Sequence, residues 1–368
     1  MTKIVVCCGS GGVGKTTTAA ALALRAAERG RTVCVLTIDP ARRLAQSMGL
    51  SELDNTPRPV PDIDGSAGGE LLAMMLDMKR TFDEIIVAHS DPERAQQILE
   101  NPFYQTVSSS LSGTQEYMAM EKLGQLRAQA EAGQAPWDLI VVDTPPSRSA
   151  LDFLDAPKRM ASFLDGRFIR VLLAPARAGG RAYLKVFTAG MGAVTGVLSK
   201  VIGTQLLTDA QTFVTAMDTV FGGFRERAER TYTLLQAPGT AFAVVAAPEP
   251  DALREAAYFV ERLAADAMPL AGLVLNRVHD SAASDLSAEQ SLVAADRLAA
   301  TTSHPMVVGL LRLHAERMQR ISRERRLVGR FTAAFPKVRI ARARAQASDI
   351  HDLDGLRRVA AELAGTPG

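Results

Sequence analysis

Short runs of consecutive apolar residues alternate with longer helical patterns along this chain. The first apolar run, residues 3–8, is followed by a glycine-rich loop, an Ala- and Leu-rich stretch over 16–28, and a second apolar run over 33–36. The Ala-rich stretch closes on Arg29 and Gly30, a basic last turn followed by a helix-ending glycine. This order predicts a β-α-β unit, in which parallel strands are joined by a right-handed crossover.

Strand patterns return further along the chain, at residues 139–142, 241–245, 272–275 and 338–340. Helical patterns lie between them, notably over 251–265 and 314–327. Because strands and helices alternate, we expect an α/β fold built on a doubly wound, mostly parallel sheet.

Two gaps between predicted strands are too long for ordinary crossovers, since a β-α-β unit needs only about 30 residues. Both gaps are predicted to be mainly helical, over 70–79, 81–89, 92–100, 116–132, 158–173, 181–202 and 209–236. We therefore expect a single domain over 1–368 with helical insertions at about 55–132 and 150–237. The segments 55–69 and 278–287 are polar and rich in turn-forming residues, which predicts loops.

Composition narrows the function classes. The 368 residues are 47% hydrophobic and 22% charged, and the net charge of +2 does not favour a nucleic-acid partner. A strand pattern begins at Lys3 and leaves no room for a signal peptide, so a cytoplasmic location is expected. The three cysteines lie on predicted strands without a Cys-x-x-Cys pair, so zinc is not expected. Lys200 interrupts the apolar stretch 186–203 and leaves about 14 uninterrupted residues, short of the roughly 20 that a spanning helix needs.

The loop after the first strand carries the most specific pattern in the chain. Residues 9–16 read Gly-Ser-Gly-Gly-Val-Gly-Lys-Thr and match G-x-x-x-x-G-K-[ST] between a predicted strand and a predicted helix. In this pattern, backbone N–H groups and the helix N-terminus bind phosphates. We expect Lys15 to contact the β- and γ-phosphates and Thr16 to bind Mg²⁺. The candidate nucleotide-binding residues are Gly9, Ser10, Gly11, Gly12, Val13, Gly14, Lys15, Thr16, Thr17 and Asn276.

Three further polar residues follow predicted strands. Asp143 ends the run Leu-Ile-Val-Val-Asp, the position of a carboxylate that holds Mg²⁺, often through water. Asp39 ends the second strand, where it could orient the attacking water or simply cap a turn before Pro40. Asn276 ends the run Gly-Leu-Val-Leu-Asn and could pair with the adenine edge. Together with the glycine loop, these residues predict binding of ATP with Mg²⁺.

With these residues in place, nearly the whole chain resembles the arsenical pump-driving ATPase family, which includes the ATPase that targets tail-anchored membrane proteins. The resemblance rests on the glycine loop, Asp39-Pro40-Ala41, Asp143-Thr144-Pro145-Pro146 and Asn276. It assigns 248–263 to the helix before the Asn276 strand and 341–350 to the adenine loop. The segments 36–50 and 349–359 look most like the paired actinobacterial members of the family, whose two paralogues can associate. The resemblance implies a dimer, homo- or heteromeric, that couples ATP hydrolysis to opening. Its implied further partner is a hydrophobic client or a membrane protein.

Two departures from the family pattern bear on activity. Ser10 stands where the family carries a lysine that reaches the partner's phosphates, so a homodimer of this chain could not make that contact. Arg148 and Ser149 stand where the family usually has Gly and His. The sequence also lacks the thiols of a zinc-pinned dimer or an arsenite site.

Three functions remain open at this point. The first is a slow MgATPase that acts as a switch, paired with a lysine-bearing paralogue. The second is a catalytically weak nucleotide-binding subunit that holds a client through its helical insert, with 184–220 as a candidate apolar groove or an ordinary core. The third is a DNA-partition ATPase, for which the basic run 312–330 is the candidate patch, although it reads better as a solvated helix face.

Overall fold

The computed structural model divides the chain into two compact units. It describes residues 2–38, 43–102, 104–105, 115–145, 223, 226–227, 229–301 and 304–365. One unit, here called the sheet unit, comprises Met1–Met75, Pro136–Ala150 and Leu235–Gly368. The other, called the insert unit, comprises Leu76–Ala135 and Leu151–Leu234. The two segments of the insert unit fall largely within the two predicted helical insertions.

The sheet unit is built on one sheet of eight strands in the order β3-β4-β2-β5-β1-β6-β7-β8. The strands are β1 (Lys3–Gly9), β2 (Thr32–Thr37), β3 (Arg58–Pro59), β4 (Glu70–Met75), β5 (Leu139–Asp143), β6 (Thr240–Ala246), β7 (Leu270–Val278) and β8 (Ile340–Arg344). Neighbouring strands pair in parallel, except that the short edge strand β3 runs antiparallel to β4. The predicted doubly wound, mostly parallel sheet is therefore confirmed.

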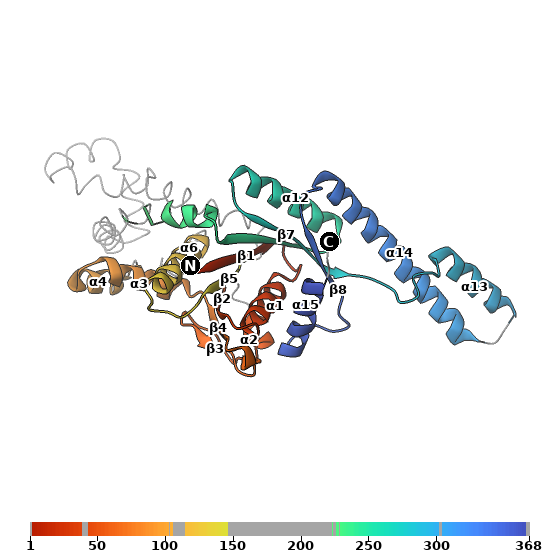
Figure 1. Ribbon diagram of the computed structural model, residues 1–368, viewed down its shortest axis with the longest axis horizontal. Helices are drawn as coiled ribbons and strands as arrows, with labels where there is room; N and C mark the ends of the chain where they lie inside the picture. The colour runs from red at the N-terminus through yellow and green to blue at the C-terminus, as the bar shows by residue number, and fades with distance from the viewer. Residues whose placement is uncertain are drawn as a thin grey trace, which may run out of the picture. The chain divides into compact units, whose positions relative to one another are not determined.

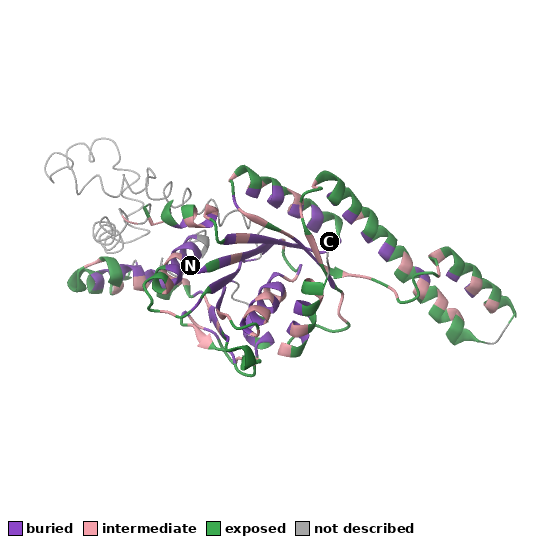
Figure 2. Ribbon diagram, viewed as in Figure 1, coloured by how far each residue is buried: buried purple, intermediate pink, exposed green. Residues whose placement is uncertain are grey.

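Helices cover both faces of this sheet (Figure 1). On one face lie α1 (Lys15–Ala27), α2 (Arg43–Ser47) and α15 (Leu353–Gly365), and on the other lies α12 (Pro250–Ala265). Small side chains let α1 approach the sheet closely: Ala19, Ala20 and Ala23 are fully buried in the main core, together with Leu24. The strands and the inward faces of these helices form the buried interior of the unit (Figure 2). This packing holds the start of α1 rigidly at the end of β1.

A helical hairpin follows β7. It consists of α13 (Ala288–Thr301) and α14 (Pro305–Ala334), and it extends away from the sheet (Figure 1). The 30 residues of α14 span about 45 Å. The predicted helix 314–327 lies inside α14. The sequence analysis did not predict α13, which buries only Ser291 and Ala295 and therefore lacks a strong apolar stripe.

The described part of the insert unit is helical. It contains α3 (Met78–His89), α4 (Pro92–Leu99) and α6 (Gln115–Glu131), close to the predicted helices 81–89, 92–100 and 116–132. The Lys122 ammonium lies 2.8 Å from Glu84 of α3, and Arg227 lies 2.7 Å from Glu121. The predicted helices 158–173 and 181–202 and the stretches 186–203 and 184–220 lie outside the described residues.

One predicted helix is wrong. Residues 70–79 were expected to be helical, but Glu70–Met75 forms β4, which pairs with β2 from Thr32 opposite Glu70 to Thr37 opposite Met75. The sequence Glu-Leu-Leu-Ala-Met-Met consists of strong helix formers, and pairing inside the sheet overrides this weak local preference. The last predicted strand, 338–340, is likewise shifted to Ile340–Arg344.

Among the described residues, no helix combines the length and the apolar character that crossing a bilayer would require.

Candidate phosphate-binding site

The loop between β1 and α1 is shaped by glycines that contact neighbouring strands. Gly14 caps α1 in the left-handed region at φ 92°, and a Cβ added there would overlap the Asn276 amide. A Cβ on Gly9 would overlap the Val245 carbonyl oxygen of β6. Because only glycine fits both contacts, these two positions fix the path of the loop. The loop opens directly into the N-terminus of α1, as a phosphate site requires.

Lys15 begins α1 and turns back over this loop. Its ammonium donates a hydrogen bond to the Ser10 carbonyl oxygen at 2.8 Å, and the residue is only 6% exposed. The positive charge is therefore held within the loop that would surround the phosphates. The sequence analysis had predicted Lys15 at this position from the loop pattern.

A buried hydrogen-bond cluster joins α1, β2 and β5. The Asp143 carboxylate is fully buried, and its Oδ2 accepts from the Thr16 hydroxyl at 2.7 Å and from the Thr37 hydroxyl at 2.9 Å. Thr37 lies opposite Asp143 in the parallel register of β2 and β5. The predicted neighbours Thr16 and Asp143 are thus brought together. Thr37 was missed, although a polar residue ending the strand before Asp39 was an available signal.

The oxygen atoms of this cluster suit Mg²⁺. A hydroxyl and a carboxylate are hard ligands, and magnesium sites commonly combine one or two carboxylates with phosphates and water. The Thr16 and Asp143 oxygens lie 2.7 Å apart. Among the residues that the structure describes, no group of three or more His, Cys, Asp or Glu side chains could hold a metal by itself. A magnesium ion here would therefore rely on the phosphates of a ligand for part of its shell.

Asn276 supports the loop from the end of β7. Its Nδ2 donates to the Val13 carbonyl oxygen at 2.9 Å, and the amide packs against Gly14. The sequence analysis predicted that this amide pairs with adenine, and that pairing stays a prediction. This hydrogen bond connects the end of β7 to the phosphate-binding loop, although Asn276 and Val13 are 263 residues apart in sequence.

A cavity of about 580 Å³ lies beside the loop. It is lined by Gly12, Gly14, Lys15, Thr16, Thr17, Arg43, Gln46, Ser47, Arg277, Asp349, Ile350 and His351. Residues 349–350 belong to the segment that the resemblance assigns to an adenine loop. The sequence analysis missed Arg43 at the start of α2, Arg277 near the end of β7 and His351, because single basic residues without a motif around them carry no recognisable pattern. Arg277 has φ 59°, an uncommon backbone conformation for a residue other than glycine.

A second cavity, of about 490 Å³, lies along the other side of the loop. Ser10, Gly11, Gly12 and Val13 form its loop wall. The opposite wall carries three carboxylates, from Glu249, Asp251 and Glu255. Arg277 also lines this cavity, so three carboxylates and one guanidinium lie along this side of the loop.

The buried thiols beside the site are expected to be unreactive. Cys7 and Cys8 of β1 and Cys34 of β2 are all buried, in agreement with their predicted place on strands. Burial raises the pKa of the Cys8 thiol to about 12, despite the opposing charge of Lys15. Burial, followed by the Asp143 charge, raises the pKa of Cys7. Since the thiolate is the reactive form, these cysteines act as small apolar residues.

Three residues of the sequence analysis cannot be placed in the site. Asp39, Arg148 and Ser149 lie outside the described residues. The role of Asp39 in orienting the attacking water stays a prediction.

Two features define this fold and site as those of a P-loop NTPase. The phosphate-binding loop follows β1 of a parallel sheet, and a carboxylate at the end of a strand is hydrogen-bonded to the first hydroxyl of α1. The family model for the anion-transporting ATPase matches residues 2–297, and the chain belongs to this family.

Curated relatives share similarity over part of the chain. The arsenical pump-driving ATPase of Acidiphilium multivorum is 30% identical over 159 residues, which are 43% of this chain and 26% of that protein. The ATPase GET3 of Malassezia globosa is 29% identical over 155 residues, which are 42% of each chain. The uncharacterized protein SCO2128 of Streptomyces coelicolor is 33% identical over 193 residues, which are 51% of this chain and 43% of that protein. The chain thus spans less than half the length of these relatives.

Proposed function

We propose that this chain binds MgATP beside the phosphate-binding loop and hydrolyses it slowly, as a nucleotide-driven switch. The observation that carries the proposal is the buried Asp143 carboxylate hydrogen-bonded to the Thr16 hydroxyl at the start of α1. Membership of an ATPase family, and relatives named as ATPases, support it.

Each site residue has a role in this proposal. Lys15 exchanges its contact with the Ser10 carbonyl oxygen for the β- and γ-phosphates. Thr16 and Asp143 hold Mg²⁺, the latter through water, and the ion neutralises phosphate charge. Asp39 orients the attacking water. The backbone N–H groups of the loop bind phosphate oxygens without a change of charge state.

Calorimetry with MgATP and MgADP tests nucleotide binding. A hydrogen bond to a charged group is worth about 1.5–3 kcal/mol, so Lys15→Ala should bind about ten- to a hundred-fold more weakly. Lys3→Ala removes an exposed lysine from the other end of β1 and should bind like the wild type. The proposal fails if folded wild-type protein shows no magnesium-dependent affinity for adenine nucleotides.

Phosphate release tests the role of Asp39 separately. If Asp39 orients water, Asp39→Asn should retain MgATP affinity and lose turnover. Equal losses of binding and turnover would instead assign Asp39 to nucleotide binding or to the turn before Pro40.

We further propose that the chain works as a dimer with a lysine-bearing paralogue. Ser10 supplies no positive charge, and the described residues that line the cavity beside it include three carboxylates and a single cation, Arg277. This excess of negative charge favours a cation from a partner. Phosphate release should therefore rise when the paralogue is added. Ser10→Lys should raise release by this chain alone, whereas Ser10→Met, of similar length and uncharged, should not. Absence of stimulation by the paralogue would remove the pairing.

A second candidate function is a nucleotide-binding subunit with negligible hydrolysis that holds a client through its insert unit. The observation that favours it is again the uncharged Ser10. This second function would replace the proposed ATPase switch if the wild type bound MgATP but released phosphate no faster than Lys15→Ala.

A further inference from the structure

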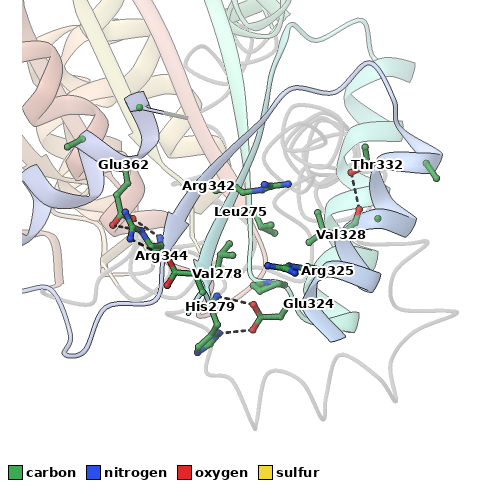
Figure 3. A pocket seen from close by; sticks show the side chains of 16 residues that line it. Leu275, Val278, His279, Glu324, Arg325, Val328, Thr332, Arg342, Arg344 and Glu362 are labelled. Carbon is green, nitrogen blue, oxygen red and sulfur yellow. Dashed lines mark hydrogen bonds and ion pairs between the residues drawn. The ribbon is translucent and has the colours of Figure 1, made fainter. Parts of the chain in front are cut away.

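An open cavity of about 910 Å³ lies in the sheet unit, away from the phosphate-binding loop. Its walls come from the end of β7, from β8, from α15 and from the second half of α14 (Figure 3). It shares no lining residue with the two cavities beside the loop. Arg342 and Arg344 fall in the segment 341–350 that the resemblance assigns to an adenine loop, but other residues of that segment, Asp349 and Ile350, line the cavity beside the phosphate-binding loop.

The carboxylates around this cavity are already engaged. Glu324 of α14 accepts from the His279 backbone N–H at 2.9 Å and contacts the His279 ring nitrogen Nδ1 at 2.6 Å. Glu362 of α15 accepts from the Arg344 backbone N–H at 2.6 Å and lies 3.5 Å from its guanidinium. Asp280 lies 3.3 Å from the same guanidinium. Each of these three acids is thus engaged by a hydrogen bond or an ion pair on the rim.

Two arginines of the cavity are not neutralised in this way. Arg325 of α14 and Arg342 of β8 have no ion pair with a carboxylate among the described residues. Figure 3 shows both side chains projecting into the space between β8 and α14. An arginine fork binds planar or tetrahedral oxyanions through paired hydrogen bonds.

The cavity also has an apolar wall. Leu275 and Val278 of β7 face Val328 of α14 across it, and Leu275 and Val328 are at most 9% exposed (Figure 3). The Thr332 hydroxyl on this wall donates a hydrogen bond to the Val328 carbonyl oxygen at 3.0 Å. An apolar wall beside two arginines that have no ion pair among the described residues suits a ligand with one anionic end and one apolar end.

The surrounding segment is strongly basic. Residues 305–344 contain eleven Arg or Lys residues and two Glu residues, whereas the whole chain carries a net charge of +2. This concentration of positive charge raises the local concentration of anions and speeds their approach.

We propose that this cavity is a second ligand site, which binds an amphipathic organic anion. Arg325 and Arg342 hold its carboxylate or phosphate head, and the wall of Leu275, Val278 and Val328 covers its apolar body. The cavity volume lies within the range of small-molecule sites, about 300–1,000 Å³.

Calorimetry with octanoate, octyl phosphate and octanol tests this site in the full-length protein. At least one of the two anions should bind saturably with one site per chain. Neutral octanol should bind at least ten-fold more weakly than that anion. Preference for octanoate or for octyl phosphate identifies the head group. The proposal is overturned if neither anion saturates, or if octanol binds as well as both.

Two glycines of α14 provide a matched pair of variants. Gly329 lines the cavity and Gly309 does not, and a Cβ at either position meets no atom within 4 Å. Both substitutions to Leu remove a helical glycine, so both should retain the fold. Gly329→Leu should weaken anion binding because its side chain occupies part of the cavity, and Gly309→Leu should leave the affinity unchanged. Equal affinities in the two variants would overturn the proposal.

Charge variants locate the head group. Because both arginines are solvent-exposed, Arg325→Ala and Arg342→Ala should each lower the affinity for the anion by only about three- to ten-fold. Arg330→Ala, also on α14 but outside the cavity, should have no effect. Lys15→Ala should retain octyl phosphate binding, which separates this site from the phosphate-binding loop. Loss of binding in Lys15→Ala alone would assign the anion to the loop and refute the second site.

Discussion

The hydrogen bond from Thr37 to Asp143 is the site contact whose energetic role can be tested most directly. Thr37→Val replaces the hydroxyl with a methyl group of similar shape inside β2. The Asp143 carboxylate is fully buried, and its Oδ2 then loses the donor at 2.9 Å while it keeps Thr16 at 2.7 Å. A hydrogen bond to a buried charged group contributes about 1.5–3 kcal/mol, so the free energy of unfolding of the sheet unit should fall by about that amount.

The expected change is large enough for a melting experiment. For a unit of about 200 residues, each kcal/mol lowers Tm by about 2–4 °C, so Thr37→Val should melt about 3–12 °C below the wild type without nucleotide. Thr37→Ser keeps the hydroxyl and should recover most of this loss. Circular dichroism or scanning calorimetry measures all three proteins. If Thr37→Val and Thr37→Ser melt together, the Thr37 hydroxyl does not stabilise the buried carboxylate and the reasoning is wrong.

Three further predictions concern the phosphate-binding loop, the buried thiols and the contacts of Glu324 in α14 with His279. Gly14→Ala should melt below Gly49→Ala, because both place alanine at positive φ, at a cost of about 1–2 kcal/mol, but only position 14 also overlaps the Asn276 amide. Since burial raises the pKa of Cys8 from 9.0 to about 12, its thiol ionises first in the unfolded chain. The free energy of unfolding should therefore fall by up to about 1.4 kcal/mol per pH unit as pH rises from 9 toward 12. Urea midpoints at pH 8 and pH 10 should show a smaller fall for Cys8→Ala, and an unchanged slope would contradict this. Glu324→Ala removes the acceptor of two contacts and should cost about 1.5–3 kcal/mol, whereas Glu316→Ala on the exposed face of α14 should melt like the wild type.

Much of the fold could be predicted from local pattern. The apolar runs of β1, β2, β5 and β6 are buried strands with few alternatives, and the glycine loop fixes where α1 begins. The helix 70–79 was predicted wrongly because local helix preference and pairing with β2 compete at that segment. Local sequence records the first influence and not the second.

The sequence by itself determined the phosphate-binding loop and the residue types that can hold a nucleotide and its metal, because these depend on contiguous residues between one strand and one helix. Only the tertiary structure decided that Thr37 joins Thr16 on Asp143, that Asn276 supports Val13, and that Arg325 and Arg342 face one cavity. These groups come from strands and helices far apart in the chain. Their meeting depends on strand order and register, which hydrogen bonding and burial over the whole sheet decide together.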